Sequence, residues 1–549
     1  MKSDIEKVVQ TVCESLYGVS ISSSIVRTEK KFGDFSSNIA MQLTKQLKRP
    51  PMDIAKEIIH EIEDNNIFSK LDVLKPGFIN FTVKDVMLIE SLKLTNDLQK
   101  FNSSKQILIE YGDPNPFKEM HLGHIYTAII GDTLASLLES SGADVKRLCY
   151  QGDVGLHVAK AIYVVGEYMK WNLDGLEEAY ASHSLGYFYA SGEKAYNENE
   201  TAKTKIQGIN QNIYKKDNDI VNKIYDLGKK ISYERFDKTF DDIGVYFDKK
   251  YFESESSKIG EKLVRDNIPK VFEKSDGAVI YRGEKDGLHT RVFINSRGFT
   301  TYDAKELGLT VLKHGDFPKA DISIIITAAE QDEYFKVVLA ALAKIDPKLA
   351  QKTIHLSHGF LSLTSGKMSS RTGKVFTGAD LVSQVHQMVD LKYKDSKVKK
   401  EIFLAALRYT FLRQRIGIDI VFDVEQSIAL EGNSGPYLQY AHARACSILA
   451  KAKNIDTKFG DKTLQSDERD LVVKICDFPD VILEATKLYL PHQICTYLFE
   501  LAKEFNSFYE KNRVIDDPRM NLRLAIARSY KDVLEEGLRL LHIPSPESM

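Results

Sequence analysis

The sequence predicts a multidomain α/β protein in which a small α+β module precedes a doubly wound parallel sheet and an all-helical region follows it. Three observations predict this order: a length of 549 residues, a strand–loop–helix–strand pattern that begins at Gln106, and a helical pattern that dominates after about Asp390. A single hydrophobic core stops growing at roughly 250–300 residues, so a chain of this length divides into at least two domains.

The first hundred residues predict a module of their own. Residues 5–16 and 50–62 space their apolar side chains by three and four, as amphipathic helices do, and residues 77–83 alternate like a short strand. A Gly33-Asp34 turn lies between them, ahead of another apolar helical run. We therefore expect an α+β domain at residues 1–100.

The central segment predicts a Rossmann-like sheet. QILIEY (106–111) is a short apolar run, HIYTAIIGDTLASLLESSG (124–142) has helical periodicity, and VKRLCY (145–150) is again strand-like. Sheet-like runs return at VFINS, DISIIIT and TIHLSHGFLSL. This is the β-α-β order of a doubly wound parallel sheet, in which ligands bind beyond the carboxyl ends of the strands. We expect this domain at residues 101–388, with a polar helical insertion at about 160–235 to which no motif assigns a role.

The remaining residues, 389–549, predict an all-helical domain. Its first part contains the basic stretch KYKDSKVKKEIFLAALRYTFLRQR (392–415). Taken alone, that stretch is most simply a solvated helix face, and the alternative is a local patch that binds nucleic acid. Because the net charge of the chain is only −2, any nucleic-acid partner must be met by local patches of this kind.

Several classes of protein are disfavoured by the composition. The five cysteines are Cys13, Cys149, Cys446, Cys476 and Cys495, and no C-x-x-C pair that could start a zinc site or a redox motif is present. No window approaches the roughly 18 apolar residues of a membrane span, and the N-terminus resembles neither a signal nor a transit peptide. We expect a cytoplasmic protein without a structural metal or a membrane contact.

The sequence HLGH places His121 and His124 around Gly123, in the first βα turn of the predicted sheet. Alone, the pattern could indicate metal ligands, a phosphate site, or polar residues that only start a helix. Zinc would need further ligands nearby, which the sequence does not offer. The position of the turn favours phosphate, because the helix that follows presents free N–H groups and the positive end of its dipole.

A second segment, GKMSSRTG (366–373), follows the last predicted strand. Lys367, Arg371 and Lys374 carry positive charge there, beside the hydroxyls of Ser369 and Ser370. In isolation this would be an ordinary exposed loop. With HLGH it is far more specific, because both segments then lie at the carboxyl edge of one sheet, around a space that suits ATP.

This pair of segments resembles the HIGH and KMSKS signatures of class I aminoacyl-tRNA synthetases, and the chain is similar to one family of that class, the arginyl-tRNA synthetases. The similarity extends over almost the whole chain, through stretches such as IEYGDPNPFKEMHLGHIYTAIIGD, YQGDVG, DDIGVYFD, FTTYDAKELG, AAEQDEYF and GPYLQYAHAR. It implies an arginine–tRNA ligase that forms arginyl-adenylate from L-arginine and ATP with Mg²⁺. It also implies arginine transfer to the terminal ribose of tRNA(Arg), activation that waits for tRNA, and a DALR-type anticodon-binding domain.

The resemblance assigns the ATP site. It implies contacts from His121, Gly123, His124, Lys367, Met368, Ser369, Ser370 and Arg371, of which His121, His124 and Lys367 are catalytic. The sequence departs from the usual signature, because Ser370 stands where KMSKS has its second lysine. In arginyl enzymes with this deficit, a lysine just upstream of the first signature histidine compensates, and Lys118 occupies that place. The alternative for Lys118 is a solvated loop lysine.

The resemblance also assigns substrate contacts. Glu110, Asn115, Tyr302, Glu306 and Gln331 match positions that hold arginine, although Glu306 replaces the aspartate usual in the family and is one methylene longer. Contacts with tRNA are implied for Phe32 and Asn38 at the elbow and for Tyr437, Gln439, Tyr440 and Arg444 near the anticodon. Tyr437 and Tyr440 have the alternative of being packing residues, because a helical core produces the same spacing.

Two other functions compete with this interpretation. A different class I synthetase, such as the cysteinyl type, shares the helical C-terminal region but would need zinc-ligand cysteines, which are absent from the sequence. A non-catalytic tRNA-binding paralogue would have lost His121, His124 or Lys367, and all three are present. We expect a monomeric ligase.

Overall fold

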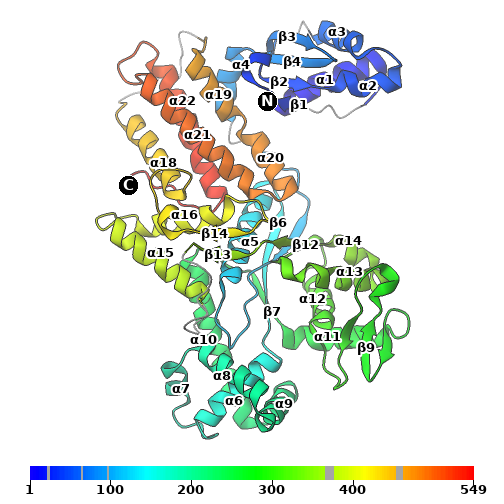
Figure 1. Ribbon diagram of the computed structural model, residues 1–549. Coiled ribbons are helices and arrows are strands. Elements are labelled where there is room, and N and C mark those ends of the chain that lie inside the picture. The colour runs from blue at the N-terminus through cyan, green and yellow to red at the C-terminus, as the bar shows by residue number, and fades with distance from the viewer. Residues whose placement is uncertain (21–24, 63–65, 95–97, 365–375, 453–461) are drawn as a thin grey trace. The chain divides into compact units, whose positions relative to one another are not determined.

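Figure 1 shows the computed structural model, which describes residues 1–549 except 21–24, 63–65, 95–97, 365–375 and 453–461. The chain forms two compact units. The first comprises Met1–Gln99, Tyr437–Arg539 and Pro544–Met549, and the second comprises Lys100–Pro436 and Leu540–Ile543. The sequence predicted an all-helical domain from residue 389 onward, whereas the structure divides that region between the two units after Pro436.

The second unit is built on a parallel sheet with the strand order β12-β11-β5-β6-β7. The central strand β5 ends at Glu110, which lies beside Leu148 of β6 and Ile325 of β11. The predicted doubly wound sheet is therefore confirmed, and its carboxyl edge begins at Glu110. The strands are β5 (Gln106–Glu110), β6 (Asp144–Gln151), β7 (Lys249–Phe252), β11 (Ala320–Ala328) and β12 (Thr353–His358).

Helices cover this sheet because side chains alternate along each strand. Leu108 and Leu148 point to the face on which Leu309 of α12 (Tyr302–Asp316) packs. Helix α5 (Leu122–Ser140) packs against β5, β6 and β11, and it is apolar enough to be buried along almost its whole length. Both helices begin at the carboxyl edge of the sheet, so their first turns face the same space.

The polar insertion between β6 and β7 is a helical subdomain. Figure 1 shows α6, α8 and α9 lying together at one end of this unit. They enclose a separate hydrophobic core that includes Ile162, Ile206 and Ile224. Its helices are α6 (Leu156–Tyr168), α7 (Leu176–Ser182), α8 (Leu185–Glu198), α9 (Glu200–Lys215) and α10 (Asp219–Asp242), so it is slightly longer than the predicted 160–235.

The rest of the second unit follows the sheet in sequence. The run VFINS forms β10, which pairs antiparallel with β9 rather than joining the parallel sheet. The remaining elements are α11 (Glu253–Asp266), β8 (Glu273–Ser275), β9 (Ala278–Tyr281), η3 (Gly283–Asp286), β10 (Arg291–Ile294), η4 (Ala329–Gln331), α13 (Asp332–Ile345), α14 (Pro347–Lys352), β13 (Leu361–Leu363), α15 (Gly378–Lys392), α16 (Lys399–Leu412), β14 (Ile420–Phe422) and α17 (Val424–Ser427).

The basic stretch at 392–415 is only in part the solvated face that its composition suggested, because Lys394, Lys397, Lys400 and Arg415 are exposed. It contains α16, which is buried from Ile402 to Leu412. The Arg408 guanidinium is fully buried, pairs with Asp132 of α5 at 2.6 Å and donates to the carbonyl oxygens of Ile243 and Leu541. This arginine satisfies buried carbonyls within the second unit, and its charge is not available to a partner.

The first unit contains a four-stranded antiparallel sheet with the order β1-β2-β4-β3, together with the C-terminal helices. Arg469 of α19 pairs with Asp34 and Asp85 of the N-terminal module. Its elements are α1 (Lys2–Tyr17), β1 (Ile25–Arg27), η1 (Lys30–Phe32), β2 (Phe35–Ser37), α2 (Ile39–Leu47), α3 (Pro51–Ile62), β3 (Phe68–Leu74), β4 (Phe78–Val83), α4 (Asp85–Ser91), η2 (Leu92–Leu94), α19 (Ser466–Cys476), α20 (Phe478–Leu488), α21 (Pro491–Lys511) and α22 (Met520–Leu540). Helix α18 (Gly435–Ala450) begins in the second unit and continues in the first.

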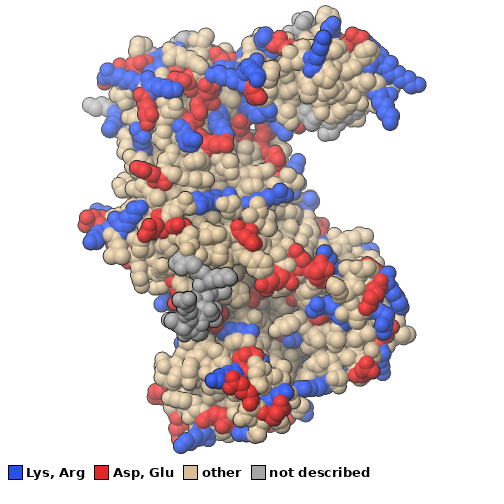
Figure 2. Space-filling model, viewed as in Figure 1, with Lys and Arg blue, Asp and Glu red and all other residues tan. Residues whose placement is uncertain are grey.

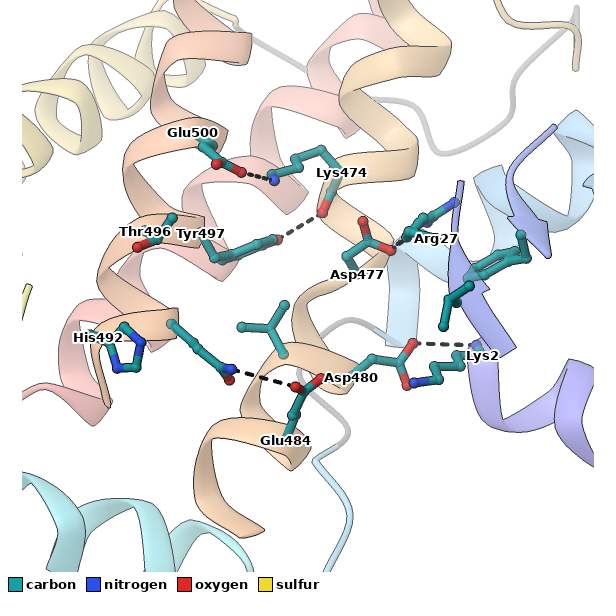
Figure 3. Close-up of a pocket in the computed structure, with 14 residues that line it drawn as sticks. Lys2, Arg27, Lys474, Asp477, Asp480, Glu484, His492, Thr496, Tyr497 and Glu500 are labelled. Carbon is teal, nitrogen blue, oxygen red and sulfur yellow. Dashed lines mark hydrogen bonds and ion pairs between the residues drawn. The ribbon is translucent and has the colours of Figure 1, made fainter. Parts of the chain in front are cut away.

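A cleft of about 550 Å³ lies within the first unit, between β1 and helices α20 and α21 (Figure 3). Arg27 reaches across it to Asp477, and the backbone N–H of Lys2 donates to Asp480. The charges that line this cleft therefore largely satisfy one another.

The distribution of charged side chains on the surface agrees with the low net charge. On the face drawn in Figure 2, Lys and Arg side chains are interspersed with Asp and Glu side chains on both units. Among the described residues, no helix is long and apolar enough to cross a membrane.

Candidate active site

A cavity of about 210 Å³ opens at the carboxyl edge of the parallel sheet. It brings together the three residues of the HLGH turn that were assigned to ATP and all five residues assigned to arginine. The predicted residues that line it are Glu110, Asn115, His121, Gly123, His124, Tyr302, Glu306 and Gln331. These residues come from three segments of the chain, 110–124, 302–306 and 331, which the fold brings together.

The two histidines of the HLGH turn form a stacked pair at the N-terminus of α5. Their ring centroids lie 3.6 Å apart, and the backbone N–H of His121 donates to Nδ1 of His124 over 3.1 Å. Burial, together with the charge of nearby Lys118, holds the pKa of His121 below its usual value and that of His124 well below it. His124 is therefore neutral near pH 7, and because its Nδ1 accepts, its proton is on Nε2.

The inner wall of the cavity is acidic, and two of its carboxylates are neutralised by buried lysines. Glu110 accepts a hydrogen bond from Lys313 at 2.6 Å, and Glu253 is paired with Lys305. The side chains of both pairs are almost completely buried. Because each lysine satisfies one carboxylate, these pairs fix the shape of the wall without adding net charge.

Among the described residues, no cation pairs directly with two further carboxyl groups in the wall. Oε2 of Glu306 is buried and has no hydrogen-bond partner among the described residues. Burial and the neighbouring Glu110 charge raise the pKa of Glu306 well above its usual value. Asp113 accepts from the Tyr150 N–H, and burial with Glu110 raises its pKa as well. A bound cation would relieve both groups.

The remaining predicted residues surround this acidic wall. Glu306 lies one helical turn after Tyr302 on α12, so both face the cavity. Tyr302 lies at the rim with 54% of its surface exposed, and partial desolvation together with the Glu253 charge raises its pKa to about 12. Asn115 approaches so closely to Gly152 that a Cβ there would lie 2.1 Å from its Oδ1, which explains the glycine of the QGD stretch. Gln331 lies on the opposite rim, at the end of η4.

Lys118 lies beside this site, in the loop that leads to the histidines. Its ammonium nitrogen is 4.5 Å from the centre of the Tyr189 ring, and the described residues supply no carboxylate ion pair to it. Burial lowers its pKa, and its charge in turn lowers the pKa values of His121, His124 and His157. Lys118 therefore acts on the histidine pair through its charge, and it has no direct ion pair among the described residues, although the Glu193 and Glu253 charges raise its pKa.

Three family models match the chain and together cover nearly all of it. Residues 86–418 match the catalytic domain described as "tRNA synthetases class I (R)". The chain belongs to the arginyl-tRNA synthetase family. Residues 1–83 match the arginyl tRNA synthetase N terminal domain and residues 438–549 the DALR anticodon binding domain.

Individual relatives agree with this membership in the arginyl-tRNA synthetase family. An arginine–tRNA ligase of Borreliella afzelii is 30% identical over 93% of this chain and 92% of its own length. The arginyl-tRNA synthetase structure from Thermus thermophilus matches with a TM-score of 0.82 and 25% identity, covering 100% of both chains. The Plasmodium falciparum enzyme shares the fold, with a TM-score of 0.81, 20% identity and coverage of 100% of this chain and 99% of its own.

The second signature of the arginyl-tRNA synthetases follows β13 in the sequence. The segment GKMSSRTG, with Lys367, Met368, Ser369, Ser370, Arg371 and the following Lys374, lies outside the described residues. The predicted roles of these residues remain predictions. The last strand before it, β13, ends at Leu363.

The residues assigned to tRNA differ in exposure. Phe32 and Tyr440 are exposed, at 38% and 46%, whereas Asn38 is half-buried at the start of α2. Tyr437 and Arg444 are half-buried and both interact with Asn506. Gln439 has 0% exposure and donates its amide to the carbonyl of Pro544, so it packs the C-terminal tail and has no surface to offer a nucleotide. The assignment of Gln439 to tRNA binding is corrected accordingly.

Sequence reasoning missed the residues that prepare the cavity wall. Lys305, Lys313, Glu253 and Asp113 were not singled out, although they decide the charge of the site. One signal was available: Lys305 and Lys313 are eight residues apart, on a helix whose Leu307 and Leu309 are fully buried. Lysines on a buried helix need carboxylate partners.

Proposed function

We propose that this protein is an arginine–tRNA ligase that activates L-arginine with MgATP and transfers it to the 3′-terminal ribose of tRNA(Arg). The observation that carries the proposal is the unpartnered, buried Oε2 of Glu306 in an acidic cavity beside a neutral histidine pair. Family membership supplies the reaction class, and the cavity supplies the reason for the amino acid.

The charges of the cavity favour a ligand with a cationic side chain. Glu110 and Glu253 are each matched by a lysine, while no described residue forms such a pair with Glu306 or Asp113. Arginine brings a guanidinium and an α-ammonium, which are two positive charges. The guanidinium is planar, cannot lose its proton at ordinary pH, and donates two parallel hydrogen bonds to one carboxylate. An uncharged amino acid would leave Glu306 buried without a partner.

The first reaction step needs positioning rather than a protein nucleophile. An oxygen of the arginine carboxylate attacks the α-phosphorus of ATP, the new O–P bond forms, and the bond to pyrophosphate breaks with its electron pair. Charge is then spread over phosphoryl oxygens, which hydrogen-bond donors and cations stabilise. His121 and His124 offer neutral donors at the N-terminus of α5, and Lys118 adds a positive charge nearby.

The other partners follow from the family and from exposure. Phe32 and Tyr440 offer exposed aromatic rings on which unpaired tRNA bases can stack. We infer that the protein works as a cytoplasmic monomer.

The test of this function is aminoacylation of total tRNA with each of the amino acids in turn. We expect ATP-dependent charging with arginine alone. If lysine or another amino acid is charged in its place, or if arginine gives no product, the proposed function is wrong.

Replacing Lys118 with alanine tests whether this residue acts in adenylate formation rather than in tRNA binding. We expect the rate of adenylate formation to fall by roughly 10²-fold, because a cation near the transferred phosphoryl group stabilises the transition state. The dissociation constant for tRNA should stay nearly unchanged, as a filter-binding titration can show. A wild-type rate in Lys118→Ala would mean that Lys118 is only a loop lysine.

A further inference from the structure

Three consecutive residues of the loop before HLGH, Phe117, Lys118 and Glu119, each contact the helical insertion formed by α6 to α10. The N–H of Phe117 donates to the Ser232 hydroxyl of α10 at 3.0 Å. The ammonium of Lys118 lies over the Tyr189 ring of α8. The carboxylate of Glu119 accepts from the N–H of Gly186, in the first turn of α8, at 3.2 Å. The sequence assigned no role to this insertion.

The first of these contacts anchors the loop. Phe117 has a φ of +64°, a left-handed conformation that a bulky side chain rarely adopts. Its ring is fully buried in the hydrophobic core of the insertion, against Gly228, where a Cβ would lie only 2.3 Å from the Phe117 ring. The packing within the insertion therefore holds the backbone in the conformation that presents the next residue, Lys118.

The second contact holds the ammonium itself. Tyr189 is half-buried on α8, and its hydroxyl is hydrogen-bonded to Glu193, so the ring has a fixed orientation. Glu193 in turn pairs with Lys160 at 2.7 Å, which leaves it committed to another lysine. An aromatic ring attracts a cation without neutralising it, whereas a carboxylate would. Lys118 is thus oriented without a direct ion pair among the described residues, although the nearby Glu193 charge acts on it.

We propose that the helical insertion serves the adenylation reaction, with Tyr189 as a positioning residue that holds Lys118 toward the ATP phosphates. This inference rests on the proposed function, because it presumes that Lys118 acts on ATP. It gives the insertion a part in catalysis.

The chain offers a matched control in the same helix. The Tyr196 ring, seven residues after Tyr189 on α8, lies 4.5 Å from the Lys160 ammonium, the same distance as in the Tyr189–Lys118 pair. Lys160 is not part of the loop that leads to HLGH, and it has Glu193 as an ion-pair partner. Tyr196→Leu therefore reproduces the loss of a ring over a lysine without touching Lys118.

The kinetic test measures arginine-dependent adenylate formation in the presence of tRNA. We expect Tyr189→Leu to lower the maximal rate by roughly 5- to 30-fold, with little change in the KM for arginine. Tyr189→Phe should retain most of the rate because it keeps the ring. In a Lys118→Ala background, Tyr189→Leu should have no further effect, and Tyr196→Leu should behave like the wild type. A loss in Tyr189→Leu that adds in full to that of Lys118→Ala would overturn the proposal.

A second measurement does not depend on activity. Lysine acetylation rates in the folded full-length protein, followed by mass spectrometry, report how well each ammonium is covered. We expect Lys118 to react faster in Tyr189→Leu and at the wild-type rate in Tyr196→Leu, in which Lys160 reacts faster instead. Unchanged reactivity of Lys118 in Tyr189→Leu would contradict the proposed contact, whether or not the protein activates arginine. A wild-type protein that does not activate arginine would instead contradict the proposed function.

Discussion

Replacing Glu306 with glutamine is expected to raise the KM for arginine by about 10- to 150-fold and to make the free protein more stable. The first effect follows because a charge-assisted hydrogen bond in a buried site contributes about 1.5–3 kcal/mol. The second follows because glutamine stays neutral, whereas Glu306 takes up a proton on folding, which costs free energy above the ordinary carboxyl pKa. Substituting a residue with a purely structural role would destabilise the protein. Weaker arginine binding together with higher stability of the free protein therefore identifies a ligand-binding group.

The pH dependence of Glu306 has a defined sign. Its pKa is raised in the folded state, first by burial and then by Glu110, so the native protein holds a proton that the unfolded chain has released. Stability therefore falls as the pH rises from the ordinary carboxyl pKa through the raised one. Arginine binds the ionised form, so its KM should increase as the pH is lowered, and this dependence should be weaker in Glu306→Gln.

The measurement combines thermal unfolding of the free protein with steady-state kinetics from about pH 6 to about pH 9. Glu330→Gln is a suitable control, because Glu330 is exposed on η4, next to the cavity residue Gln331. It should change neither KM nor stability. An unchanged KM in Glu306→Gln would remove this residue from the arginine site.

Replacing His124 with alanine is expected to lower the rate of adenylate formation by about 10²- to 10³-fold, as the loss of one transition-state donor does in other enzymes. The neutral imidazole has its proton on Nε2, because Nδ1 accepts from the backbone of His121. The KM for arginine should change little, since the acidic wall is untouched. Stopped-flow or quenched-flow measurement of adenylate formation with tRNA present gives the rate.

His314→Ala is the matched control for the histidine variant. His314 is also a partly buried imidazole of the second unit, with a pKa lowered to about 4 by burial, but it does not line the cavity. We expect a rate near that of the wild type. If both variants lose activity equally, the effect of His124→Ala is one of stability rather than of catalysis.

The parts of the fold that could be predicted are those set by local patterns. The apolar run at 106–111 became β5, and the helical periodicity after HLGH became α5. Because parallel strands end at a common edge, the sequence alone was enough to place the HLGH turn beside a ligand space. The family resemblance then supplied Glu110, Asn115, Tyr302, Glu306 and Gln331, which the structure brings to one cavity.

What could not be predicted depends on contacts between distant residues. The pairing of Lys313 with Glu110 joins positions 203 apart in sequence, and no local pattern encodes it. The same holds for the buried pair of Arg408 and Asp132, which joins positions 276 apart in sequence. The amide side chain of Gln439 could hydrogen-bond a nucleotide, but it packs against the C-terminal tail and is not at the surface.

The central claim is that a buried carboxylate without a partner selects the guanidinium of arginine. Citrulline tests it directly, because it has nearly the same shape and carries no side-chain charge. The measurement is the ratio of kcat/KM for arginine to that for citrulline, in the wild type and in Glu306→Gln. We predict a strong preference for arginine in the wild type that falls by about 10-fold or more in the variant. An equal ratio in the two proteins would contradict the account.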